Sequence, residues 1–73
     1  MHTMIIVSEN GDDRLHWNPD DPGSVERVRE VFDDLARRGY LGSRMASPTE
    51  GEQIKAFDPN AQEIIMSPAV VAG

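Results

Sequence analysis

Side chains that could do chemistry are few in this sequence. It has two histidines, no cysteine and three pairs of adjacent aspartates, Asp12-Asp13, Asp20-Asp21 and Asp33-Asp34. Adjacent side chains on a strand or helix point apart, so no pair forms a carboxylate dyad by itself. His2 lies at a terminus that we expect to be flexible, and His16 is expected on a sheet surface. With no Gly-x-Ser-x-Gly nucleophile elbow either, we predict no catalytic residue and no enzyme activity.

Metal and cofactor sites are also not indicated. Oxygen ligands for a hard cation occur in the segments 10–13 and 18–21, but neither segment matches the Asp-x-Asx-x-Asx-Gly calcium loop. The six glycines are scattered along the chain and form no phosphate-binding loop. The sequence therefore predicts no metal and no cofactor.

Length and composition predict one small domain. The 73 residues are enough for a single domain at residues 1–68, with a flexible tail at 69–73. Without cysteine there is no disulfide, which favours a reducing compartment. The longest apolar run, Met4 to Val7, is far too short to span a membrane. We therefore expect a cytoplasmic protein that does not contact a membrane.

Charge limits the choice of partners. Thirteen acidic against seven basic side chains give a net charge of −6, which repels phosphate backbones and argues against direct nucleic-acid binding. A solvated acidic surface accounts for this charge, and an inhibitor that imitates nucleic acid is an alternative. Six of the seven basic residues are arginine, whose planar group favours paired contacts and hence binding to a protein.

Two stretches, His16 to Asp20 and Ala56 to Asn60, share the order aromatic-Asx-Pro-Asx. Proline removes a backbone donor, and Asx side chains bond their own backbone two residues on, so each stretch ends a strand. The aromatics at these stops, Trp17 and Phe57, are expected to fill the core against the helix described next.

The helix is predicted from Asp21 or Ser24 to about Arg38. Asp21 suits the N-cap and Pro22 the first helical position, while Gly39 suits the stop. Favourable ion pairs are expected between Asp33 and Arg37 and between Asp34 and Arg38. An apolar stripe runs along one side of this helix, at Val25, Val28, Val31, Phe32 and Leu35.

A hairpin precedes this helix. Asn10-Gly11 predicts a two-residue type I′ turn, which sets Ile6 opposite Leu15. By the period of two, one face of the hairpin carries Met4, Ile6, Leu15 and Trp17, and the other carries Ile5, Val7, Arg14 and His16. The first face is the expected core.

Three strands follow the helix, at about 40–46, 53–57 and 63–67. The first two are expected to form a hairpin across the turn-rich segment 47–52. The fold class is therefore α+β, in the order ββαβββ, with a single antiparallel or mixed sheet and one helix packed on one face.

Two resemblances accompany this layout. The strand lengths, the single helix and the terminal Gly73 resemble the β-grasp layout of ubiquitin-like proteins. The order of GDDRLHWNPDDP, RRGYLGSR, GEQIKAFDPNAQEII and SPAVVAG resembles small uncharacterised proteins of bacteria and phages. The first resemblance implies a carrier or modifier that uses its C-terminal glycine, although Ala72 stands where such carriers have a second glycine. The second implies no function.

One helix shields only one side of a sheet. Ile5, Val7 and either Ile65 or Ile64 with Met66 must therefore point to the side without the helix. Arg14, His16, Arg44 and Lys55 are expected on the same side. Apolar patches of this kind on small proteins often mark interfaces. We expect a partner surface at Ile5, Val7, Arg14, His16 and Ile65, through which the protein binds itself or another protein.

Overall fold

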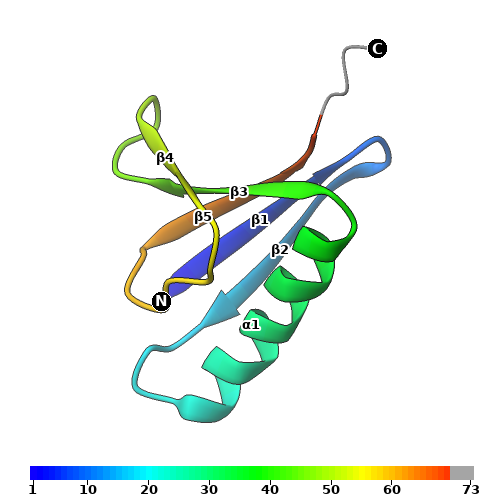
Figure 1. The fold of residues 1–73 in the computed structure, drawn as a ribbon. Coiled ribbons are helices and arrows are strands. Elements are labelled where there is room, and N and C mark those ends of the chain that lie inside the picture. Colours follow the sequence, from blue (N-terminus) through cyan, green and yellow to red (C-terminus); the bar gives the residue numbers. More distant parts are fainter. Residues whose placement is uncertain (70–73) are drawn as a thin grey trace.

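The computed structural model describes residues 1–69 and has the predicted order ββαβββ (Figure 1). The conjugation site considered above, Gly73, lies outside the described residues. The elements are β1 (His2–Ser8), β2 (Gly11–Trp17), α1 (Pro22–Arg37), β3 (Tyr40–Met45), β4 (Gly51–Ile54) and β5 (Glu63–Pro68).

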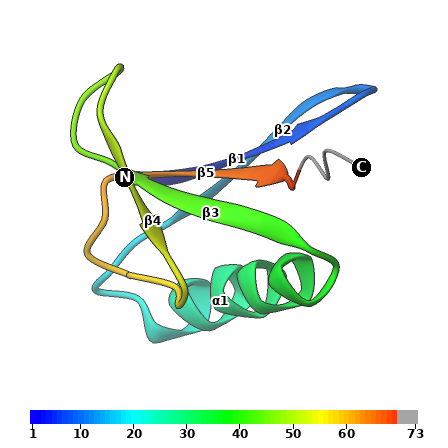
Figure 2. The ribbon, with the colours of Figure 1, turned by 45° about the horizontal axis from the view of Figure 1, so that its top comes forward.

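The five strands form one mixed sheet in the order β2-β1-β5-β3-β4. β1 and β5 run parallel, and the remaining neighbours are antiparallel. α1 lies on one side of this sheet and leaves the other side without a helix (Figures 1 and 2). The predicted fold class is therefore confirmed, with the mixed form of the sheet.

The register of the first hairpin differs from the prediction by two residues. Ile6 lies opposite Asp13 instead of Leu15, because the turn is formed by Glu9 and Asn10. Gly11 adopts a φ of 115° at the start of β2, whereas no non-glycine residue in the described chain has a positive φ, so Asn10 does not enter a type I′ turn. A shift of two residues keeps every side chain on its predicted face.

The N-terminus is held in place, contrary to the expectation of a flexible His2. His2 belongs to β1 and lies opposite Trp17. Its Nδ1 is hydrogen-bonded to the carbonyl oxygen of Ala61, and its ring lies 5.4 Å from that of Trp17. These contacts join β1 to the segment before β5.

α1 begins and ends where its capping residues predict. The Asp21 side chain accepts a hydrogen bond from the Gly23 backbone N–H at 3.1 Å, with Pro22 at the first position. At the other end Gly39 takes a φ of 92°. The predicted pair between Asp34 and Arg38 forms at 3.1 Å. The predicted pair between Asp33 and Arg37 is wrong, since Arg37 also turns to Asp34, at 3.4 Å.

The core lies between α1 and the sheet, around three aromatic rings. Phe57 packs on Trp17, with ring centroids 5.0 Å apart, and on Phe32 of α1, with centroids 6.0 Å apart. Trp17 and Phe32 are each 1% exposed, and Met4, Ile64 and Met66 are fully buried beside them. The expectation that Trp17 and Phe57 fill the core is therefore confirmed.

The two aromatic-Asx-Pro-Asx stretches form the same local structure. In the first, the Asn18 side chain accepts a hydrogen bond from the backbone N–H two residues on, at 2.9 Å. In the second, Asp58 accepts the equivalent bond, also at 2.9 Å. The Trp17 indole N–H donates to the Pro59 carbonyl at 2.9 Å and so ties the two turns together at one end of the sheet.

Candidate partner-binding face

The side of the sheet without the helix is the candidate site, and we call it the open face. The alternation along β5 shows which residue of this strand belongs to it. Ile64 and Met66 are fully buried under α1, so Ile65 between them points to the open face. Of the two alternatives left by the sequence, the structure thus selects Ile65. The open face includes Thr3, Ile5, Val7, Asp12, Arg14, His16, Leu41, Ser43, Met45, Glu63, Ile65 and Ser67.

Apolar side chains occupy the middle of the open face. Ile5 and Ile65 are direct partners in the parallel pair of β1 and β5, and Val7 follows two residues along β1. All three are half-buried and lie on the side away from the core. The structure therefore brings together the three aliphatic residues that the period of two assigned to this side.

Sequence reasoning missed Leu41, which extends this apolar area onto β3. Leu41 is 44% exposed, one of two large apolar side chains exposed among residues 1–69. Its face is set by the next residue: Gly42 packs against Phe32 under α1, so its neighbours point outward. The signal in the sequence was the glycine itself, the one residue of this strand that leaves room for a helix side chain.

Polar side chains border the apolar middle along β2. Arg14 lies opposite Ile5, and His16 lies opposite Thr3, with His16 Nδ1 and Thr3 Oγ1 3.0 Å apart. Both Arg14 and His16 are exposed. These two predicted site residues therefore stand at the β2 edge of the open face, beside the aliphatic cluster.

Arg44 was expected on the open face and instead lies on the helix side, in register with Ile64. Its guanidinium donates to Asp58 at 2.8 Å and to Glu52 at 2.7 Å. The hydrogen bond from Arg44, aided by the Asn60 backbone N–H, holds the pKa of Asp58 below its usual value. Arg44 therefore anchors the turn that follows Phe57. Lys55 is exposed just beyond the end of β4 and belongs to neither face.

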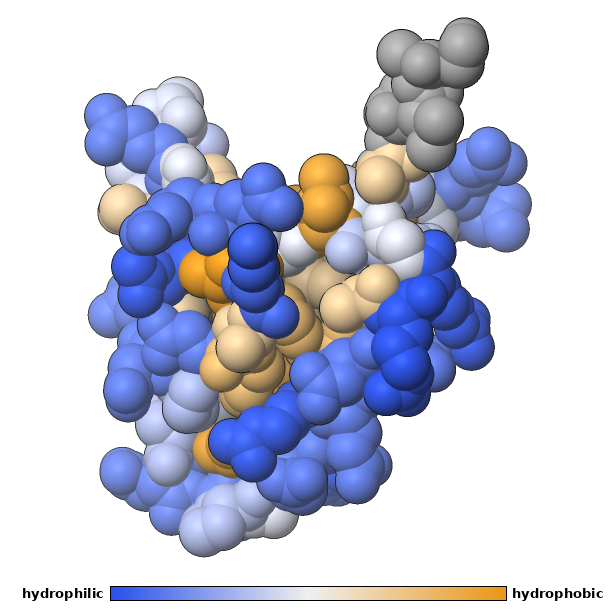
Figure 3. Space-filling view, in the orientation of Figure 1, coloured by the Kyte–Doolittle hydropathy of each residue, from blue (hydrophilic) through white to orange (hydrophobic). Residues whose placement is uncertain are grey.

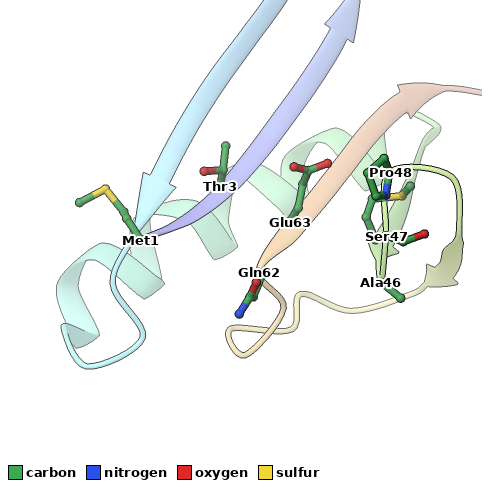
Figure 4. A pocket seen from close by; sticks show the side chains of 8 residues that line it. Met1, Thr3, Ala46, Ser47, Pro48, Gln62 and Glu63 are labelled. Carbon is green, nitrogen blue, oxygen red and sulfur yellow. The ribbon is translucent and has the colours of Figure 1, made fainter.

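Both hairpins project on the side of the open face. In Figure 2 the tips of the β1–β2 and β3–β4 hairpins rise beyond the middle of the sheet, on the side away from α1. A cavity of about 420 Å³ lies at the β3–β4 end, where Thr3, Met45 and Glu63 of the open face meet the segment 46–48. Figure 4 shows these side chains around the cavity, with Glu63 between Thr3 and the 46–48 segment.

Four carboxylates of the described chain are paired with arginine. Glu26 and Asp34 of α1 bond arginines of the same helix, and Glu52 and Asp58 share Arg44. The helix-side view in Figure 3 shows hydrophilic surface around a smaller hydrophobic area in the middle. The other nine of the thirteen carboxylates form no ion pair in the described chain, so the alternative of an inhibitor that imitates nucleic acid stays a prediction.

Among residues 1–69, no three His, Cys, Asp or Glu side chains are grouped so that they could hold a metal ion. The described part of the chain also has no helix of the length and apolar character that crossing a membrane requires.

A comparison with protein-family models, with curated proteins and with solved structures finds no match to this chain. The resemblances to ubiquitin-like proteins and to small bacterial and phage proteins therefore remain predictions, and the open face has to be interpreted from its own geometry.

Proposed function

We propose that this protein is a non-catalytic interaction module whose open face binds a second copy of the chain or a component of a larger assembly, such as a phage or prophage particle, in the cytoplasm. The observation that carries the proposal is the pairing of Ile5 with Ile65 on the side of the sheet that α1 leaves bare. Val7 and Leu41 extend this apolar area, and Arg14 and His16 border it with polar groups. An apolar centre with a polar rim is typical of protein interfaces.

Binding at this face would remove apolar surface from water. An apolar area of ~500 Å² would contribute about 12 kcal/mol at ~25 cal/mol per Å², before the loss of translational and rotational freedom is subtracted. A domain of this size has only ~5–15 kcal/mol of folding stability, so binding would also stabilise it considerably.

Self-association is tested by light scattering and sedimentation of the purified protein over a wide concentration range. The variant Ile65→Asp places a charge at the centre of the open face, and Ala36→Asp makes the same change in charge at an exposed position on α1. We expect association by the wild type and Ala36→Asp and none by Ile65→Asp. Circular dichroism melting confirms that both variants are folded.

Binding to another protein is tested by affinity capture from the source cells with the same three proteins. A true partner is recovered with the wild type and Ala36→Asp and is lost with Ile65→Asp. A monomer at every concentration, with no captured protein that depends on Ile65, would refute the proposal.

A second candidate function is a ubiquitin-like carrier. The observation that favours it is the central parallel pair of β1 and β5 in a mixed sheet crossed by one helix, which agrees with the β-grasp layout. Its reactive group would be Gly73, outside the described residues. Mass spectrometry of the protein from its source cells tests this function: an adenylate, thiocarboxylate or isopeptide at Gly73 supports it, and an unmodified terminus contradicts it.

A further inference from the structure

The open face carries its unpaired charges on two different strands. Arg14 and Asp12 belong to β2, and Glu63 belongs to β5. None of the three forms an ion pair in the part of the chain that the structure describes. Ile5 and Ile65, direct partners across β1 and β5, form the apolar centre between these strands. Arg14 and Glu63 therefore stand on opposite halves of the open face.

Glu63 is placed to receive a cation from another molecule. It is half-buried and lines the cavity of about 420 Å³ at the β3–β4 end of the open face (Figure 4). None of the described residues that line this cavity is Lys or Arg, and Met1, which is 91% exposed, makes no ion pair with Glu63 through its α-amino group. Arg44 is held on the helix side by Asp58 and Glu52. A cation for this carboxylate has therefore to come from a bound molecule.

A second copy laid face to face brings the two charges together when the two-fold axis runs parallel to the strands. Such an axis, between β1 and β5, sets β1 of one copy over β5 of the other, and β2 over β3. Ile5 then faces Ile65. Arg14 faces Ser43, which lies one strand and two residues from Glu63. Stacked sheets lie ~10 Å apart and this lateral offset is ~8 Å, which the arginine and glutamate side chains span together.

We propose that the partner of the open face is a second copy of this chain, and that Arg14 of each copy pairs with Glu63 of the other. This inference rests on the proposed function and selects one of its two kinds of partner. The arrangement forms the same ion pair twice, as an isologous interface requires. The two pairs lie beside an apolar centre formed by Ile5 and Ile65 of both copies.

The alternative face-to-face arrangement opposes like charges. A two-fold axis perpendicular to the strands, through the middle of the face, sets β2 over β2, so that Arg14 faces Arg14 of the second copy. Like charges that face each other across an interface are unfavourable. With the axis parallel to the strands, Asp12 faces Leu41 and His16 faces Met45. This arrangement therefore places no charge opposite a like charge.

The surroundings of the open face permit a second copy to approach. The two hairpin tips, at residues 9–10 and 46–50, lie at opposite ends of the strands, so neither stands over the apolar centre (Figure 2). Among the described strand positions of the open face, two of the thirteen carboxylates are found, Asp12 and Glu63. Most of the net charge of −6 is thus carried elsewhere, where salt screens the repulsion between copies.

Charge reversal tests the ion pair by sedimentation of the purified proteins. Arg14→Glu and Glu63→Arg should each raise the Kd of the dimer about ten- to hundredfold, because two attractive pairs per dimer become repulsive. Mixed in equal amounts, the two variants should associate within about threefold of the wild type. Each mixed dimer restores both pairs, one of them with its charges exchanged.

Arg27→Glu and Glu30→Arg are the matched controls, because both positions are exposed on α1 and carry the same changes of charge. Alone and mixed, they should associate as the wild type does. Glu63→Gln removes the carboxylate charge without adding another and should weaken association about three- to tenfold. Circular dichroism identifies any variant that does not fold, and Glu63→Gln then stands in for Glu63→Arg.

Three results of these measurements would overturn the inference. The first is unchanged association of Arg14→Glu or Glu63→Gln. The second is a mixture of the two folded reversal variants that stays monomeric. The third is association of Arg14→Glu with Asp12→Arg, which would show that Arg14 pairs with Asp12 of the second copy. A monomeric wild type that captures another protein through Ile65 would also refute the inference, but it would leave the proposed function intact.

Discussion

Gly42 of β3 allows the sheet to approach α1 closely, and its replacement by alanine should destabilise the fold. A Cβ at this position would lie 2.7 Å from Phe32 Cε2 and 3.0 Å from both Phe32 Cζ and Met66 Sδ. Carbon atoms in favourable contact lie ~3.5–4.0 Å apart, so the added methyl group is too close by about 1 Å. Phe32 and Met66 are 1% and 0% exposed and have no free space to enter.

Overpacking of this kind costs ~1–3 kcal/mol, and the reduced freedom of the unfolded chain offsets ~0.4–1 kcal/mol of it. Gly42→Ala should therefore lower the free energy of unfolding by about 1–2 kcal/mol, with a fall in Tm of ~4–8 °C for each kcal/mol. Gly51→Ala is the matched control. Its Cβ would lie 2.6 Å from Met45 Sδ, but Met45 is half-buried on the open face and its flexible end can turn aside.

Urea unfolding followed by the fluorescence of Trp17, the single tryptophan, measures both variants. The account requires a lower urea midpoint for Gly42→Ala and a nearly unchanged one for Gly51→Ala. If Gly42→Ala were as stable as the wild type, α1 would not pack on this face of β3. Leu41 would then lose the argument that places it on the open face.

Three other changes have defined outcomes. Asp58→Asn should lower stability at neutral pH but not in acid. Because Arg44 depresses the pKa of Asp58 in the folded protein, the ionised carboxylate stabilises the fold at pH values above the unfolded-state pKa of about 3.8, and this contribution is lost as the pH falls below that value. The urea midpoints of the variant and the wild type, measured against pH, should therefore converge in acid. Trp17→Phe should lower the free energy of unfolding by about 1–3 kcal/mol through a cavity and a lost indole hydrogen bond, measured by circular dichroism. Asp21→Ala should remove ~1 kcal/mol of capping energy in thermal melts, whereas the adjacent Asp20→Ala should leave Tm within a degree or two, because Asp20 does not cap α1.

Short-range features of the sequence predicted most of the helix and strand positions, but they did not predict which strands distant in the sequence pair with each other. The cap at Asp21, the stop at Gly39 and the apolar stripe of α1 depend on neighbours within a few residues, and all were confirmed. The parallel pairing of β1 with β5 joins segments about 60 residues apart, and no short-range pattern specifies it. The choice between an antiparallel and a mixed sheet therefore needed the structure.

The faces of the strands were predictable where the period of two was clear. In the first hairpin a register error of two residues left Ile5 and Val7 on the predicted side. β3 carries no such alternation, so Arg44 was placed on the wrong side and Leu41 was missed. The close contact between Gly42 and Phe32 decides the orientation of β3, and that contact exists only in the folded chain.

The most direct test of the open face compares two adjacent residues of β5 in a chain that has no native cysteine. Ile65→Cys and Ile64→Cys are treated separately with a thiol reagent under native conditions. Ile64 is fully buried under α1, so Ile64→Cys should react only through unfolding, about 10³-fold or more slowly than Ile65→Cys for a domain with ~5 kcal/mol of stability. Self-association should slow the reaction of Ile65→Cys as protein concentration rises. Equal reaction rates for the two variants, or a slower rate for Ile65→Cys in the monomer, would contradict the account.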